Sequence, residues 1–142
     1  LHLSLRRQRQ MCIRDRVYAS DIDPEMIEIA KRNAEEVGLG DIIQFNVKDV
    51  NTLSIDTDKP VALVGNPPYG ERIGDREEVE EMYRYIGTLL KQHPHLSAYI
   101  LTSNKEFEYL VNRKATKRRK LFNGYIECTY YQYWGKKQSN KN

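Results

Sequence analysis

The chain has 142 residues, a formal net charge of +3 and a mean hydropathy of −0.74, which is the size of one domain or part of one. No apolar run approaches the length of a membrane span, and residues 1–16 lack the apolar core of a secretory signal, so we expect a cytoplasmic protein. Cys12 and Cys128 form no spaced motif, so we expect reduced thiols, with neither a disulfide nor a metal site.

Short apolar runs alternate with amphipathic stretches along the chain. Residues 17–20 form a β-prone run that leads into Asp23 and Pro24, a good N-cap followed by a proline at the first helical position. Apolar residues then recur at helical spacing until Gly38, which predicts the end of a helix. Further along, we predict strands at 42–47, 61–65 and 98–102, a helix that begins with a capping box at 75–78 and carries the apolar stripe Val79, Met82, Ile86 and Leu89, and a short helix at 105–111.

The C-terminal part of the sequence predicts a β-hairpin. Asn123-Gly124 is the strongest local signal for a two-residue turn, and it separates the β-prone runs 117–122 and 125–134. Residues 135–142 are predicted to form a polar tail. Alternating strands and helices followed by this hairpin predict an α/β fold whose sheet is mostly parallel, with one antiparallel strand near its edge.

Three loops fall at the carboxyl ends of predicted strands, where parallel sheets bind ligands. Asp21 follows the first run and is suited to accept hydrogen bonds from a ribose diol, while Asp49 follows the next run and is suited to accept from an adenine amine. Each carboxylate alone is better explained as a helix cap or a solvated turn, because Asp is abundant in turns. Together with the loop at 66–70, they favour a nucleotide site.

The loop Asn66-Pro67-Pro68-Tyr69-Gly70 follows the apolar run 61–65. Neither proline has a backbone N–H, so the segment presents mainly acceptors, the Asn66 amide oxygen and the Pro67 carbonyl. Such a site suits an amine donor, and Tyr69 adds an aromatic face on which a planar ring can stack. The alternative is a rigid strand-to-loop turn with no chemical role.

Charge is distributed unevenly along the chain. Residues 113–142 hold nine Lys or Arg against one acidic residue, Glu127, whereas residues 17–112 hold nine basic and eighteen acidic residues. A basic segment on an acidic body suits a polyanion such as RNA, although a solvated or charge-guarded strand edge is an equal alternative. The candidate phosphate contacts are Arg113, Lys114, Lys117, Arg118, Arg119 and Lys120.

These ordered motifs resemble the class I S-adenosylmethionine-dependent methyltransferases that modify exocyclic amines. Residues 20–24, Asp49-Val50 and 66–69 match the ribose-binding, adenine-binding and catalytic motifs of that family. The nearer resemblance is to the THUMP-containing bacterial methyltransferases that modify guanine N2 of large-subunit ribosomal RNA. It covers roughly 17–134 and rests on residues 66–74 and 120–128. The tetrapeptide 66–69 by itself leaves DNA adenine and protein glutamine methyltransferases open.

The resemblance implies a Rossmann-like fold, a cofactor and a set of roles. S-adenosylmethionine would be held by Asp21, Ile22, Asp49 and Asn66, and transfer would depend on Asn66, Pro67, Pro68 and Tyr69. Acceptors at Asn66 and Pro67 would aim the amine lone pair at the methyl sulfonium. Tyr69 would stack on a flipped-out or unpaired base.

The chain departs from the family at its N-terminal end. It has no glycine before Gly38, whereas the family places a glycine-rich cofactor loop after the first strand. We therefore expect the first strand and this loop to be missing, together with the preceding THUMP domain. The missing strand would lie between those ending at Asp21 and Asn66. Residues 10–16 resemble a translated sequencing-adapter artefact, so we expect 1–16 to be non-native and 17–134 to be a partial catalytic domain. Such a chain would bind cofactor weakly and be weakly active, inactive or a non-catalytic RNA-binding fragment.

Overall fold

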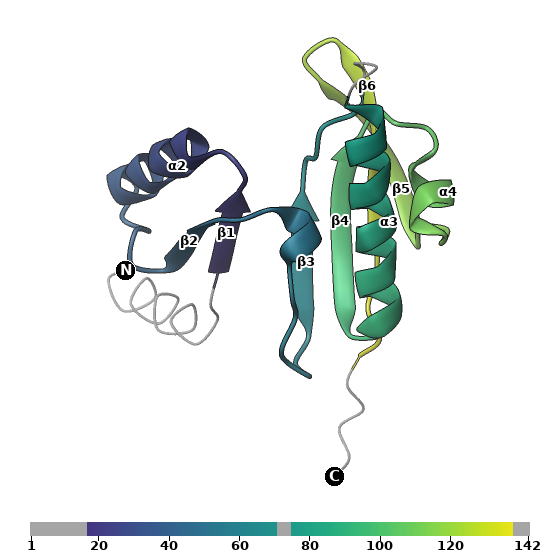
Figure 1. The fold of residues 1–142 in the computed structure, drawn as a ribbon, viewed down its shortest axis with the longest axis horizontal. Coiled ribbons are helices and arrows are strands. Elements are labelled where there is room, and N and C mark those ends of the chain that lie inside the picture. Colours follow the sequence, from purple (N-terminus) through teal and green to yellow (C-terminus); the bar gives the residue numbers. More distant parts are fainter. Residues whose placement is uncertain (1–16, 71–74, 138–142) are drawn as a thin grey trace, which may run out of the picture. The chain divides into compact units, whose positions relative to one another are not determined.

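The computed structural model describes residues 17–70 and 75–137, and the chain divides into two compact units, Leu1–Leu53 and Ser54–Asn142 (Figure 1). Each unit is described by itself. The expected non-native leader at 1–16, part of the family motif at 71–74 and the end of the polar tail at 138–142 lie outside the described residues.

The first unit contains a parallel βαβ arrangement. Strand β1 (Val17–Asp21) pairs in parallel with β2 (Ile43–Val47), and helix α2 (Pro24–Glu36) connects them. The Asp23 side chain caps α2 by accepting a hydrogen bond from the Glu25 backbone N–H, and Gly38 takes the positive φ of 74° that ends the helix, both as predicted. A short 3₁₀ helix, η1 (Val50–Thr52), follows β2.

The second unit contains a four-stranded sheet in the order β3-β4-β6-β5. Its strands are β3 (Val61–Gly65), β4 (Leu96–Thr102), β5 (Lys117–Asn123) and β6 (Ile126–Tyr133). β3 and β4 run parallel, and β6 is antiparallel to both of its neighbours, so the predicted single antiparallel strand near the edge is confirmed. The strands ending at Asp21 and Gly65 belong to separate sheets.

Helices α3 (Arg76–Gln92) and α4 (Phe107–Val111) complete the second unit. Its core is strongly aromatic: the Tyr83 ring meets Phe107 edge-on at a centroid distance of 4.9 Å, and Phe107 lies 4.8 Å from Tyr131. The two helices approach so closely that a Cβ on Gly87 would come within 2.2 Å of the Val111 carbonyl oxygen. Glycine is therefore required at this contact. None of the helices in the described part of the chain has the length and apolarity needed to cross a bilayer.

Two local predictions are wrong. The Asp75 side chain makes no capping hydrogen bond, because its backbone is already helical (φ −89°, ψ −9°) and a capping side chain needs an extended backbone to reach the next N–H groups. The hairpin turn is shifted by one residue, since Asn123 pairs with Ile126 and the loop is Gly124-Tyr125. Gly124 takes a φ of +62° at the first loop position, which is where a type II′ turn requires glycine.

Candidate active site

The loop 66–70 follows the end of β3, and a hydrogen bond from a buried tyrosine hydroxyl fixes its position. The Tyr83 hydroxyl of α3 donates to the Pro68 carbonyl at 2.9 Å, and the Thr102 hydroxyl lies 2.9 Å from the same Tyr83 oxygen. Because the single hydroxyl proton of Tyr83 is donated to the Pro68 carbonyl, Thr102 is the donor in the hydrogen bond between Thr102 and Tyr83. Burial raises the pKa of Tyr83, so the hydroxyl keeps its proton well beyond neutral pH. The loop is thus tied to the core of the unit.

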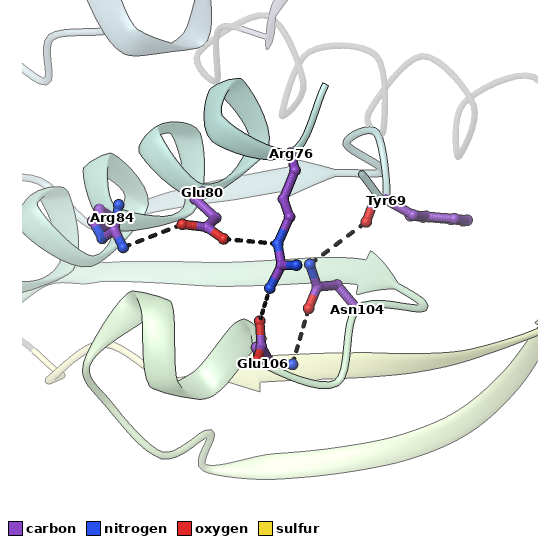
Figure 2. Close-up of polar contacts among 6 residues, drawn as sticks. All are labelled: Tyr69, Arg76, Glu80, Arg84, Asn104 and Glu106. Carbon is purple, nitrogen blue, oxygen red and sulfur yellow. Dashed lines mark hydrogen bonds and ion pairs between the residues drawn. The ribbon is translucent and has the colours of Figure 1, made fainter. Parts of the chain in front are cut away.

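Asn104, just past the end of β4, holds the next residue of the loop. Its Nδ2 donates to the Tyr69 carbonyl at 3.5 Å, while its Oδ1 accepts from the Glu106 backbone N–H at 2.9 Å (Figure 2). With the carbonyls of Pro68 and Tyr69 occupied, the Pro67 carbonyl accepts no hydrogen bond from any residue in the described ranges. The acceptor expected to face an amine is therefore available.

Ion pairs join the start of α3 to the segment before α4. Arg76 lies 3.2 Å from a carboxylate oxygen of Glu80 and 3.5 Å from one of Glu106, and Arg84 lies 3.3 Å from the other Glu80 oxygen (Figure 2). The arginines are largely exposed, so each pair contributes about 0–1 kcal/mol. Only the pair between Arg76 and Glu106 joins α3 to the segment before α4, since both Glu80 pairs lie within α3.

The Tyr69 side chain joins Asn66 to the terminal hairpin. The Tyr69 hydroxyl donates to Asn66 Oδ1 at 2.9 Å and accepts from Asn123 Nδ2 at 3.0 Å, and the Cys128 thiol lies 3.5 Å from it. Burial and the neighbouring Cys128 raise the pKa of Tyr69, so this hydroxyl also stays protonated at neutral pH. One lone pair of Asn66 Oδ1 is thus used inside the protein, and the second remains for a ligand.

Asp21 and Asp49 lie in the first unit, Asp21 as the last residue of β1 and Asp49 two residues after the end of β2. In each, one carboxylate oxygen accepts a backbone N–H two residues further on, from Asp23 at 2.8 Å and from Asn51 at 2.9 Å. Both carboxylates therefore have the local turn-stabilising role that was the alternative explanation for them. The other oxygen of each makes no hydrogen bond within the described residues, so a ligand role is compatible with it.

The surroundings of these carboxylates suit a nucleoside. Ile22, beside Asp21, exposes 68% of its surface, an apolar side chain that a planar ring can cover. Asn51 Oδ1, beside Asp49, is buried without a hydrogen-bond partner, which is unusual unless a further donor reaches it. The first unit therefore fits the adenosine end of S-adenosylmethionine. The second unit brings Asn66, Pro67, Pro68 and Tyr69 together, and the structure describes the two groups separately.

The six candidate RNA contacts differ in their surroundings. Arg118 lies 2.6 Å from Glu108, Lys120 lies 3.1 Å from Glu127, and the Arg113 guanidinium lies 5.8 Å from the centre of the Tyr133 ring. Three are exposed and form no ion pair within the described residues: Lys114, Lys117 and Arg119. β5 lies at the edge of the four-stranded sheet, so protection against edge-to-edge pairing stays an alternative role for its charges. Within the described ranges, no group of three or more His, Cys, Asp or Glu could hold a metal ion.

Comparison with known proteins identifies the family. A family model described as "RMKL-like, methyltransferase domain" matches residues 2–132. The chain belongs to this family of methyltransferase domains. It is 52% identical over 120 residues to YpsC of Bacillus subtilis (strain 168), whose name describes an RNA methyltransferase, with 84% of this chain and 31% of YpsC covered.

Two further relatives support the same assignment. The chain is 39% identical over 120 residues to "Ribosomal RNA large subunit methyltransferase K/L" of Shewanella frigidimarina (strain NCIMB 400), covering 82% of this chain and 16% of that protein. The crystal structure of SMU.472, a methyltransferase by title, superimposes with a TM-score of 0.78 at 36% identity, covering 85% of this chain and 32% of that one, and contains S-adenosylhomocysteine. The family and this neighbour indicate S-adenosylmethionine as the cofactor. The chain spans about a third or less of the length of these relatives.

Several residues of the site were not predicted from the sequence: Tyr83, Thr102, Asn104, Asn123 and Cys128. Tyr83 has a usable signal, since it lies four residues after Val79 and three before Ile86 and so shares their helical face. The predicted stripe had Met82 in its place, but Tyr83 is the fully buried residue and Met82 is half-buried. The others depend on side-chain contacts with residues far away in the sequence, which local patterns do not specify.

The buried hydroxyl pair predicts a stability effect. Tyr83→Phe leaves the Pro68 carbonyl without its donor and the Thr102 proton without its acceptor, while Thr102 Oγ1 still accepts from the Asn104 backbone N–H. The free energy of unfolding should therefore fall by about 1–3 kcal/mol. Urea unfolding of the chain, followed by fluorescence of Trp134, its one tryptophan, measures this. Tyr109→Phe, on an exposed tyrosine of α4, is the matched control and should stay within about 0.5 kcal/mol of the wild type. Equal stability of both variants would contradict a structural role for the Tyr83 hydroxyl.

Proposed function

We propose that the full-length protein containing this chain transfers a methyl group from S-adenosylmethionine to the exocyclic amine, N2, of a guanine in large-subunit ribosomal RNA. The observation that carries the proposal is the pair of acceptors, Asn66 Oδ1 and the Pro67 carbonyl, beside Tyr69 in a methyltransferase domain. The choice of RNA is supported by the names of the relatives. The choice of guanine N2 is supported by the resemblance of residues 66–74 and 120–128.

The chemistry explains why acceptors are needed. The lone pair of an aromatic amine is delocalised into its ring, so the nitrogen is a poor nucleophile. Two acceptors that bind its N–H groups, Asn66 Oδ1 and the Pro67 carbonyl, would orient the nitrogen and favour in-line transfer. Bound S-adenosylmethionine supplies the methyl group on a sulfonium, which leaves as a neutral thioether. The proton departs after the nitrogen has become cationic, so no strong general base is required.

The remaining residues would bind and orient the reactants. Asp21 would accept from the ribose diol, Asp49 from the adenine amine, and Ile22 would cover a ring face. The Tyr69 ring would stack on the target base, which must leave its helix or already be unpaired. The exposed cations Lys114, Lys117 and Arg119 would contact phosphates, whereas Arg118 and Lys120 would first have to leave their carboxylate partners.

Methyl incorporation by the full-length protein tests the substrate class. Ribosomal RNA, DNA and protein are each incubated with labelled S-adenosylmethionine, and label is expected in the RNA. Label confined to DNA or protein would favour the adenine or glutamine alternatives, and RNA binding without any transfer would favour a non-catalytic role.

The same assay tests the role of Asn66. Asn66→Ala removes the side-chain acceptor and should lower kcat by at least about 100-fold, the usual cost of one directed hydrogen bond in a transition state. Cofactor affinity, measured by calorimetry, should remain largely intact. Asn33→Ala, on an exposed asparagine of α2, serves as the control. Near-normal turnover of Asn66→Ala would remove Asn66 from this role.

The exposed cations of β5 predict a salt effect on RNA affinity. Each phosphate contact contributes about one unit to the slope of log affinity against log salt, so replacing both Lys117 and Arg119 by alanine should reduce that slope by about two. Lys91→Ala, in the last turn of α3, is the control cation. Filter binding over a series of salt concentrations measures the slope. An unchanged slope would assign these residues to guarding the strand edge.

A further inference from the structure

We propose that Asn123 is a positioning residue that sets the orientation of the Asn66 side-chain amide, acting through the Tyr69 hydroxyl. The proposal rests on the proposed transfer to an amine. It assigns a role in that reaction to the terminal hairpin, which lies more than fifty residues further along the chain than the loop 66–70.

The three side chains form a directional hydrogen-bond chain. Asn123 Nδ2 donates to the Tyr69 oxygen at 3.0 Å, and the Tyr69 hydroxyl donates to Asn66 Oδ1 at 2.9 Å. An amide nitrogen can only donate, and a phenol has a single proton. Asn123 therefore fixes the direction of the Tyr69 proton, which points toward Asn66.

The direction of the Tyr69 proton decides what Asn66 presents to a ligand. A side-chain amide has two orientations of nearly the same shape, in which the oxygen and the NH₂ group exchange places. The Tyr69 proton favours the orientation in which the oxygen lies on its side, and this oxygen keeps a second lone pair for an amine. The opposite orientation would direct N–H groups at the amine, donor against donor.

The hairpin register holds Asn123 in place. Asn123 pairs with Ile126 and Leu121 pairs with Cys128, so Asn123 and Cys128 share one face of the β5–β6 ladder. Cys128 is 1% exposed and its thiol lies 3.5 Å from the Tyr69 hydroxyl, which closes that side of the oxygen. If Asn123 were in the turn, as the sequence predicted, it would leave this ladder. Its observed place in β5 is therefore what connects the hairpin to the loop.

Asn123→Asp, a charged side chain of the same shape, tests the hydrogen bonds that connect Asn123 to Asn66 through Tyr69. Asn123→Asp keeps the side-chain shape, but an ionised carboxylate only accepts, so the Tyr69 proton turns toward Asp and the Tyr69 oxygen faces Asn66. That arrangement favours the wrong amide orientation. In the full-length protein we expect kcat for RNA methylation to fall at least about ten-fold at neutral pH, with the Kd for S-adenosylmethionine unchanged. Asn123→Ala, which removes the bond without reversing it, should cost less.

The Tyr69→Phe background separates positioning from structural support. Without the Tyr69 hydroxyl, Asn123 is no longer linked to Asn66 by hydrogen bonds. Asn123→Asp should therefore change kcat by less than about two-fold in that background. An equal loss of kcat in both backgrounds, or wild-type kcat in Asn123→Asp, would overturn the proposal. Absence of transfer by the wild-type protein to any RNA is a different result, because it would refute the proposed function and with it the premise of this inference.

Discussion

The contact on which the site depends is the buried hydrogen bond from the Tyr83 hydroxyl to the Pro68 carbonyl. A segment with two consecutive prolines cannot be held through its own N–H groups, so it must be held through its carbonyls. Tyr83 is fully buried and Thr102 is 1% exposed, and burial of either hydroxyl without a partner would cost about 1–3 kcal/mol. The hydroxyls therefore stabilise the core and the loop together. Within the described residues, the Pro67 carbonyl and one lone pair of Asn66 Oδ1 accept no hydrogen bond. These two acceptors are therefore the groups that a substrate could contact.

Under the proposed function, the two units supply different parts of one reaction. The first offers carboxylate oxygens at Asp21 and Asp49 beside the exposed Ile22, a group suited to the ribose and adenine of a nucleoside. The second offers acceptors for an amine and an aromatic face for its ring. The edge strand β5 adds free cations on one side and ends at Asn123, so the hairpin that would contact phosphates also reaches Tyr69. Under the proposed function, RNA contacts on β5 and the orientation of Asn66 belong to the same hairpin.

Much of this arrangement follows from the sequence. Apolar runs and turn residues predict all six strands and the α/β class, and the positions of Asp21, Asp49 and Asn66 at strand ends follow from the topology rule for parallel sheets. The failures have physical causes. Asp75 lost its capping role because the chain enters α3 with a helical backbone, and the hairpin register depends on cross-strand pairing, which overrides the local preference for Asn123-Gly124 as a turn. Helical spacing could have placed Tyr83 in the core, but the hydrogen bonds of Tyr83 and Asn104 to the loop could not be predicted, because they join residues fifteen and thirty-five positions apart.

We propose that the acceptors of the loop 66–70 direct methylation to one exocyclic amine. The most direct measurement is the identity of the modified nucleoside. Large-subunit ribosomal RNA methylated by the full-length protein is digested to nucleosides and analysed by mass spectrometry against methylated standards. We expect N2-methylguanosine as the product. A methyl group on a ring carbon, on a ribose oxygen or on the amine of adenine would contradict it.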